Sequence, residues 1–159
     1  MVPDATGVAF LQGLELAVVT LYAEAAVPIG SPAAVHAVTV FADHHRAHAQ
    51  ALASLAGAGA VPAAPAKLLA ALAPTDAITS ERDALAFLRT LESRLAATQQ
   101  WVLGGLSSVP AISLMASVLP VECQHATVFG SLLSLPMADV VPVAQGVGGH
   151  LDPADYTAP

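Results

Sequence analysis

Four long apolar segments with helical periodicity divide this 159-residue sequence, and each carries an ionisable side chain near its middle. Ser31 followed by Pro32 predicts a helix start, and Gly57 predicts the end of that helix. Thr79 and Ser80 each offer an N-cap for the third segment. The segments cover about residues 5–27, 32–57, 80–106 and 110–135. Short breaks pair them into two antiparallel hairpins, so the pattern predicts an all-α four-helix bundle.

The connection between the two predicted hairpins is long, and the end of the chain lacks helical periodicity. Residues 58–78 contain several prolines and have room for one short helix at about 66–73. We expect this connection to cross an end of the bundle. Beyond residue 135, prolines and glycines predict irregular structure. The sequence therefore predicts a bundle domain over residues 1–140 and an irregular C-terminal tail over residues 141–159.

Composition excludes several classes of protein. Only 5 residues are Lys or Arg and the net charge is −7, so the chain has no basic cluster for nucleic acid. Cys123 is the only cysteine, which excludes an internal disulfide, a Cys-rich zinc site and a rubredoxin-like centre. Mean hydropathy is +0.67, but polar residues and Pro110 interrupt the longest uncharged stretch, so we expect no membrane-spanning helix there. No basic segment followed by an apolar one opens the sequence, so we expect a secretion signal to be absent or already removed; a cytoplasmic protein and an exported protein with its signal peptide removed both stay open.

Three glutamates interrupt otherwise apolar helix faces. Glu15 is the only charged residue between Asp4 and Glu24. Glu122 is more isolated still, and Glu92 falls among leucines. At about 100° per residue, each of these three side chains lies on the apolar stripe of its helix. We therefore expect all three carboxylates to point into the core.

The second helix contributes imidazoles instead of a carboxylate. His45 and His48 lie on its apolar stripe, whereas His44 lies at the edge of that stripe. The pairs His45-x-x-His48 and Glu122-x-x-His125 each place two side chains at i and i+3, on one helical face. Two inward Glu residues together with two such motifs form the di-iron bundle pattern, in which one Glu-x-x-His has here become His-x-x-His.

The ionisable side chains are expected at one level of the bundle. Glu15, His45, Glu92 and Glu122 each lie about eleven to thirteen residues after a predicted helix start. No inward Lys or Arg is available at that level, because Arg94 lies only two positions from Glu92 and points elsewhere. Unpaired buried charges cost several kcal/mol each, so three carboxylates and three imidazoles together indicate a bound metal ion.

Several short segments carry a family resemblance. Residues 120–125 read Pro-Val-Glu-Cys-Gln-His, Leu-Glu in the third segment precedes Ala-Ala-Thr, and Leu-Glu in the first precedes Tyr22. Over about residues 5–140 the chain resembles the ferritin-like superfamily, and within it the bacterial ferritin-like domain proteins with Pro-Val-Glu-x-x-His in their last helix. The resemblance implies an up-down bundle with a non-haem, dinuclear metal site. Carried over by position, the metal ligands would be Glu15, His45, His48, Glu92, Glu122 and His125.

The sequence departs from the family pattern at two points. Many superfamily sites use four carboxylates, whereas three leave about +1 of charge on two divalent ions, to be met by hydroxide or another anion. Iron is expected, with manganese or zinc as alternatives. Gln99 stands two turns after Glu92, where a tyrosine would mirror Tyr22 after Glu15. Tyr22 is expected to bond to a ligand carboxylate while also packing in the core, and His44 is a candidate for a similar supporting role.

Three functions stay open at this point. The resemblance implies a dimetal oxidoreductase that reacts with dioxygen or peroxide, as a ferroxidase-like protein or a small-molecule oxidase. A metal-binding or buffering protein with a single zinc, manganese or copper ion is the first alternative. The second is a metal-free bundle that acts as an interaction module. Phe10, Leu16 and Val19, expected on the outer side of the first helix, suggest a homodimer contact.

Overall fold

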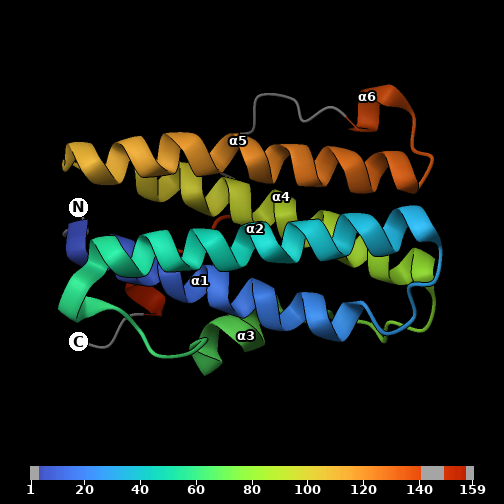
Figure 1. Ribbon diagram of the computed structural model, residues 1–159, viewed down its shortest axis with the longest axis horizontal. Helices are drawn as coiled ribbons and strands as arrows, with labels where there is room; N and C mark the ends of the chain where they lie inside the picture. Colours follow the sequence, from blue (N-terminus) through green and yellow to red (C-terminus); the bar gives the residue numbers. More distant parts are fainter. Residues whose placement is uncertain (1–3, 141–148, 157–159) are drawn as a thin grey trace.

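The computed structural model describes residues 4–140 and 149–156. Four long helices form a bundle of two antiparallel hairpins (Figure 1), and the described residues contain no strand. This confirms the predicted all-α fold. The bundle helices are α1 (Asp4–Ala25), α2 (Pro32–Ala56), α4 (Glu81–Leu103) and α5 (Val109–Leu132), and the shorter elements are η1 (Gly57–Gly59), α3 (Ala66–Leu72), α6 (Met137–Val140) and η2 (Pro153–Asp155).

Local signals explain where the long helices begin and end. The Ser80 hydroxyl accepts the backbone N–H of Asp83, and the Asp83 carboxylate accepts the N–H of Ser80, which makes a capping box. Gly57 ends α2 with a φ of 57°, a conformation that favours glycine. The predicted ends were two or three residues too long for α1, α4 and α5, because turns at residues 26–28, 104–105 and 133–134 stop each helix before the apolar pattern runs out.

Two carboxylates tie the hairpins together at opposite ends of the bundle. Asp4, at the start of α1, accepts the backbone N–H of Ser107 at 3.0 Å in the turn between α4 and α5. Glu81, at the start of α4, accepts the N–H groups of Gly30 and Ser31 at 2.8 Å each in the turn between α1 and α2. The first helix of each hairpin thus holds the turn of the other hairpin. These bonds lower the pKa of both carboxyls, since they stabilise the ionised form.

The connection between the hairpins runs along the side of the bundle instead of crossing its end, so that expectation was wrong. In Figure 1 both α2 and α4 run from the same end of the bundle, so the chain must travel back along its length between them. Gln12 of α1 fixes this segment, since its amide donates to the Val61 carbonyl at 2.9 Å and accepts the Val61 N–H at 2.7 Å. Arg94 points outward as expected and donates to the Ala71 carbonyl at 2.6 Å.

The described part of the predicted tail, residues 149–156, packs against the bundle. Leu151 is buried and donates its N–H to the Thr98 hydroxyl at 3.0 Å. The Tyr156 ring lies 6.1 Å from the ring of Phe10. Phe10 is therefore buried by its own chain, contrary to the expected exposed position on the first helix, whereas Leu16 and Val19 are partly exposed. Residues 141–148 and 157–159 of the predicted tail lie outside the described residues.

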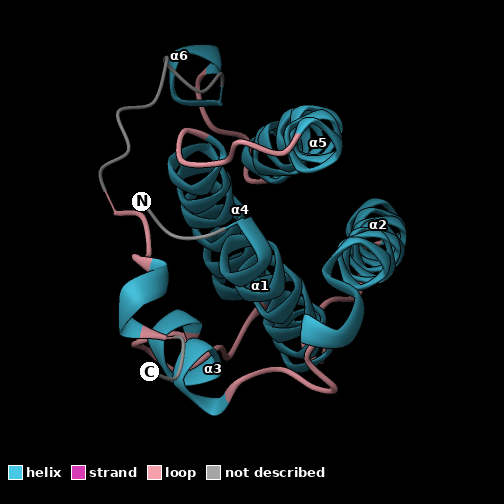
Figure 2. Ribbon diagram, turned by 90° about the vertical axis from the view of Figure 1, so that its left-hand side faces the viewer, coloured by secondary structure: helices cyan, strands magenta, loops and turns pink. Residues whose placement is uncertain are grey.

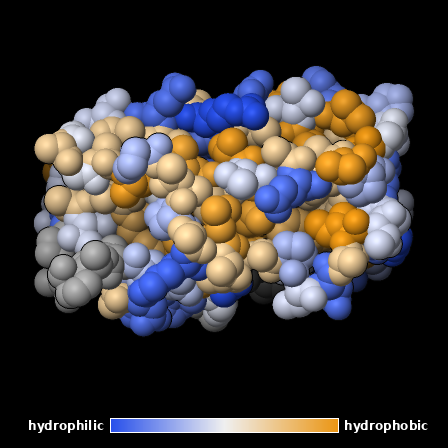
Figure 3. Space-filling model, turned by 90° about the horizontal axis from the view of Figure 1, so that it is seen from below, coloured by the Kyte–Doolittle hydropathy of each residue, from blue (hydrophilic) through white to orange (hydrophobic). Residues whose placement is uncertain are grey.

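The interior of the bundle is apolar apart from a cluster of buried polar side chains, and its surface is mixed. Viewed along its axis, the four long helices surround one core while α3 lies outside, on the side of α1 (Figure 2). Helix α1 meets the length and composition of a membrane-crossing helix, but 67% of its most apolar window is buried inside the bundle, as in a core helix. On the face seen from below Figure 1, hydrophobic side chains gather across the middle and toward the right, with hydrophilic ones mainly along the upper edge and at the lower left (Figure 3).

Candidate metal centre

All four bundle helices deliver ionisable side chains to one place in the core. Each of the six predicted ligands except His48, which is 15% exposed at its side chain, is completely or almost completely buried. Nitrogen and oxygen atoms of these residues form two groups, each with its atoms within 4.8 Å of one another. The first group is Glu15, His45, His48 and Glu122, and the second is His45, Glu92, Glu122 and His125. The structure thus brings together every residue that the resemblance implied.

His45 lies between the two groups, with one ring nitrogen directed at each. Its Nδ1 is 2.8 Å from Glu15 Oε2, and its Nε2 is 3.0 Å from Glu92 Oε1. The Tyr22 hydroxyl donates to the same oxygen of Glu92, so Tyr22 supports a carboxylate as expected. The inward stripe of α2 therefore places an imidazole where both groups can share it.

Glu122 is the second shared residue, and several atoms around it lack hydrogen bonds. Its Oε1 is 3.0 Å from His48 Nδ1, and its Oε2 is 3.1 Å from His125 Nδ1. Glu92 Oε2 lies 3.4 Å from the same nitrogen of His125. Within the described part of the chain, four of these buried atoms make no geometrically good hydrogen bond: His48 Nδ1, Glu92 Oε2, Glu122 Oε2 and His125 Nδ1. Unsatisfied nitrogen and oxygen atoms that converge in a buried space fit a metal ion with mixed imidazole and carboxylate ligands.

The histidines also balance the negative charge of the carboxylates. Burial and the charge of Glu122 raise the pKa of Glu15 to about 7. Burial lowers the pKa of His45, but the charge of Glu92 and hydrogen bonds with Glu15 and Glu92 outweigh it and raise that pKa well above its usual value. Burial raises the pKa of Glu122. Interactions with His125 and His48 and the charge of His45 outweigh this effect and hold that pKa below its usual range. Imidazolium–carboxylate pairs can therefore stabilise the cluster without metal, and a cation would displace their protons.

Gln99 takes the place where a tyrosine was expected. It is completely buried, and its Nε2 donates to Glu15 Oε1 at 2.8 Å. The Tyr22 hydroxyl plays the corresponding part for Glu92 on the other side of the site. The departure from the family pattern therefore changes the donor group and keeps a hydrogen bond to the carboxylate.

His44 lies closer to the site than its position on the edge of the α2 stripe suggested. Its Nδ1 is 2.9 Å from Nε2 of His125, and the two rings are nearly parallel, with centroids 5.2 Å apart. The helical wheel of α2 alone could not show this contact, because His125 belongs to α5. Burial and the neighbouring histidines His125, His48 and His45 lower the pKa of His44.

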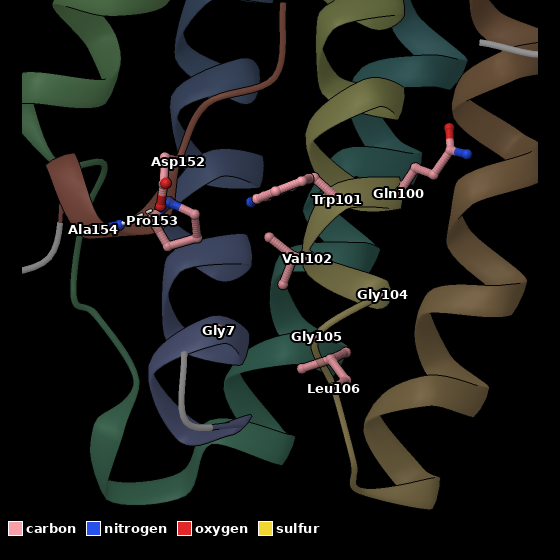
Figure 4. A pocket seen from close by; sticks show the side chains of 10 residues that line it. All are labelled: Gly7, Gln100, Trp101, Val102, Gly104, Gly105, Leu106, Asp152, Pro153 and Ala154. Carbon is pink, nitrogen blue, oxygen red and sulfur yellow. Dashed lines mark hydrogen bonds between the residues drawn. The ribbon is translucent and has the colours of Figure 1, made fainter. Parts of the chain in front are cut away.

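A separate pocket of about 700 Å³ lies where the C-terminal end of α4 meets η2 (Figure 4). Trp101 borders this pocket and stacks on His150, with ring centroids 4.3 Å apart. Asp152 is the one carboxylate among its described lining residues, and its Oδ1 already accepts the Ala154 N–H at 3.0 Å. None of the six predicted ligands lines this pocket, so the candidate chemistry lies in the bundle core.

Comparison with known proteins agrees with this architecture. A family model described as a ferritin-like domain matches residues 4–135, which span the four bundle helices and all six predicted ligands. The chain belongs to this family. Searches of curated proteins and of solved structures give no match. The resemblance inferred from the short segments of sequence is therefore confirmed at the level of the ferritin-like family.

The ferritin-like chain also contains an internal correspondence that sequence reasoning missed. Each site residue of the first hairpin has a counterpart 77 positions later in the second. The same interval relates Asp4 to Glu81 and Ser31 to Ser108, at the ends of the hairpins. Alignment of the two halves of the sequence at this offset would have revealed it. The matched site residues are Glu15 and Glu92, Tyr22 and Gln99, His45 and Glu122, and His48 and His125.

Proposed function

We propose that this ferritin-like protein binds two metal ions, with iron as the preferred metal, and reacts with dioxygen or peroxide. The activity would be that of a ferroxidase-like protein or a small-molecule oxidase. The observation that carries the proposal is the convergence of buried, unsatisfied nitrogen and oxygen atoms from all four helices. Two inward Glu residues and two i, i+3 motifs follow the ligand arrangement of ferritin-like dimetal bundles, with His-x-x-His in place of one Glu-x-x-His.

The six residues divide by their contacts. Glu15 and His48 would serve one ion, and Glu92 and His125 the other, while His45 and Glu122 face both. Iron bound here would supply the electrons that reduce dioxygen or peroxide. Tyr22 and Gln99 orient the carboxylates of Glu92 and Glu15, which keeps the ligand set in place when the charge at the site changes. Burial excludes bulk water from the site, with His48 and His44 on its more exposed side.

A single-ion function is the second candidate. The two groups of atoms share His45 and Glu122, so one ion could engage both residues and leave the other atoms to pair among themselves. The imidazoles suit zinc or copper and the carboxylates suit manganese, and the ion would then stabilise or buffer without turnover. This candidate predicts a tightly held ion that does not change oxidation state in air.

Metal stoichiometry tests the proposal. Purified protein is loaded with Fe(II) under anaerobic conditions, analysed by elemental mass spectrometry and then exposed to air. The proposal predicts about two irons per chain, oxygen uptake on exposure, and loss of both in Glu122→Ala. Glu24→Ala, which removes an exposed carboxylate from α1, is the matched control and should behave as the unaltered protein.

Two results would count against it. One inert ion per chain would support the single-ion candidate and exclude oxidase activity. Failure to bind metal under every loading condition, with an unchanged melting temperature, would exclude both functions and favour a metal-free interaction module. A homodimer, for which the partly exposed Leu16 and Val19 on the first helix remain the indication, stays a separate prediction for sedimentation measurements.

A further inference from the structure

We propose that His44 is a positioning residue that holds His125 in the orientation and ring tautomer needed to bind metal. The inference rests on the proposed function, because it concerns how one ligand of that centre is prepared. His44 itself lies outside both groups of converging atoms. Its hydrogen bond to a residue of the site is the one with His125.

The contact pattern of the His125 ring carries the argument. Nε2 of His125 is 2.9 Å from Nδ1 of His44, which is hydrogen-bonding distance. Its other nitrogen, Nδ1, is directed at Glu122 Oε2 and Glu92 Oε2, at 3.1 and 3.4 Å. This Nδ1 makes no geometrically good hydrogen bond with the described residues. One side of the ring is therefore bonded to His44, and the other faces the metal centre.

The hydrogen bond determines which nitrogen of His125 can bind a metal ion. A neutral imidazole carries its proton on one nitrogen and its lone pair on the other. When His44 Nδ1 accepts the Nε2–H of His125, the lone pair of His125 is left on Nδ1, which points into the centre. Partners that fix a ligand histidine in this way raise its basicity and set its orientation.

Phe41 adds a steric restraint to the same ring. Its ring lies against His125 with centroids 3.9 Å apart and an angle of 21° between the planes. Phe41 and His44 are both on α2, three residues apart, so one face of α2 holds the His125 ring from α5. Together they restrict both rotation of the ring and exchange of its two nitrogens.

The position that matches His44 on the other side of the pseudo-symmetric site carries a different side chain. The residue 77 positions after His44 is Val121, which would be the corresponding neighbour of His48. A valine side chain cannot accept a hydrogen bond from an imidazole. The inference therefore concerns the second group of atoms and predicts that the metal position built by Glu92 and His125 is the more preorganised of the two.

Titration with Co(II), followed by its absorption bands, tests the inference on the full chain. His44→Leu removes the acceptor and should weaken binding at one position by about 10- to 100-fold, with faster dissociation of that ion. His44→Gln offers a side-chain carbonyl and should restore the affinity to within a few-fold of the unaltered protein. His36→Leu, at an exposed histidine earlier on α2, is the matched control. The melting temperature of the metal-free protein should be unchanged in all three variants.

Nitrogen NMR of the zinc-loaded protein gives an independent readout. His125 should show a protonated Nε2 and a metal-bound Nδ1, and His44→Leu should lose this single pattern. Wild-type Co(II) affinity in His44→Leu would overturn the inference. An equal loss of Co(II) affinity in His44→Leu and His44→Gln, with a lower melting temperature of the metal-free protein, would show a structural role for His44. That result would also overturn the inference. If the unaltered protein binds no Co(II), Zn(II) or Fe(II), the proposed function itself fails; if His125→Ala removes an ion while His44→Leu does not, only the inference fails.

Discussion

The two hairpins build one site from different sets of side chains. The α1–α2 hairpin contributes one carboxylate and two imidazoles, and the α4–α5 hairpin contributes two carboxylates and one imidazole. At the positions that support the carboxylates, Tyr22 in the first hairpin corresponds to Gln99 in the second. The pairs lie 77 positions apart in the sequence, so the halves share a plan and differ in chemistry.

The difference shows that the second hairpin cannot balance its buried charges alone, whereas Glu15 of the first hairpin is paired with His45 of the same hairpin. Alone, the second hairpin would bury Glu92 and Glu122 with one imidazole between them. His45 of the first hairpin supplies the missing counter-charge, since it contacts Glu92 at 3.0 Å. Because buried charge without a partner costs several kcal/mol per ion, the site ties the two hairpins to each other. The reciprocal bonds of Asp4 and Glu81 do the same at the ends of the bundle.

The largest expected effect separates the two metal positions. Glu15 belongs only to the first group of atoms and Glu92 only to the second. Glu15→Gln and Glu92→Gln keep the side-chain shape and remove one negative charge, so each should reduce iron loading from two ions to about one. Elemental analysis after anaerobic loading measures this, with Glu24→Ala as control. Loss of both ions in either variant would show that the two positions are not separable, and retention of both would remove that residue from the ligand set.

The pH dependence of stability in metal-free protein tests the charge balance. The pKa of Glu15 is raised to about 7, so its favourable contribution is complete below its usual value and is lost as the pH rises toward 7. The pKa values of His45 and His125 are also raised, so these residues add a further loss of stability at higher pH. The pKa of Glu122 is lowered, so its effect on stability has the opposite sign. Its favourable contribution to stability is lost only as the pH falls below about 4.5. His44, with a lowered pKa, opposes the trend near pH 6.5 to a smaller extent because it is partly exposed.

Denaturant unfolding of chelator-treated protein should therefore show stability falling from about pH 5 to pH 8. In Glu15→Gln the unfolding free energy should fall by about 3 kcal/mol less over the pH range from the usual pKa of Glu15 to its raised value of about 7. Parallel pH profiles for the two proteins would contradict the assignment of this titration to Glu15.

A smaller effect compares the two supporting side chains. Tyr22→Phe removes the donor to Glu92, and Gln99→Leu removes the donor to Glu15. Each loses a hydrogen bond to a buried carboxylate, so each should lower the unfolding free energy by about 1.5–3 kcal/mol. Thermal and denaturant unfolding measure the two losses side by side. Gln99→Glu would add a fourth carboxylate and should destabilise the metal-free protein more than Gln99→Leu; a stabilised variant would contradict the charge argument.

The smallest expected effect is at the ends of the hairpins. Asp4→Ala and Glu81→Ala each remove an acceptor from the turn of the opposite hairpin. Both carboxylates are near solvent, so each variant should lower the melting temperature by a few degrees and leave metal loading unchanged. The double variant should show the sum of the single effects, because the two contacts lie at opposite ends of the bundle. A change in metal content would mean that the hairpin ends position the site.

Much of the site could be predicted because a helix has a fixed local period. Glu15, Glu92 and Glu122 each stand out from an apolar stripe, and their place along the helix put them at one level. Helix type and the hairpin pairs followed from periodicity and breaks in the same way. The helix ends were less accurate, since the apolar pattern continues past the residues where glycines and turns stop the backbone.

The sequence by itself determined the helices, the two hairpins and the set of inward ionisable residues, because each depends on spacing within one helix. Only the tertiary structure decided that His44 contacts His125, that Gln99 bonds to Glu15, and that the connection between hairpins runs along the bundle. It also decided that Phe10 is covered by its own chain. These contacts join segments far apart in the sequence, and they depend on the distance and rotation of one helix relative to another, which no single helical pattern encodes.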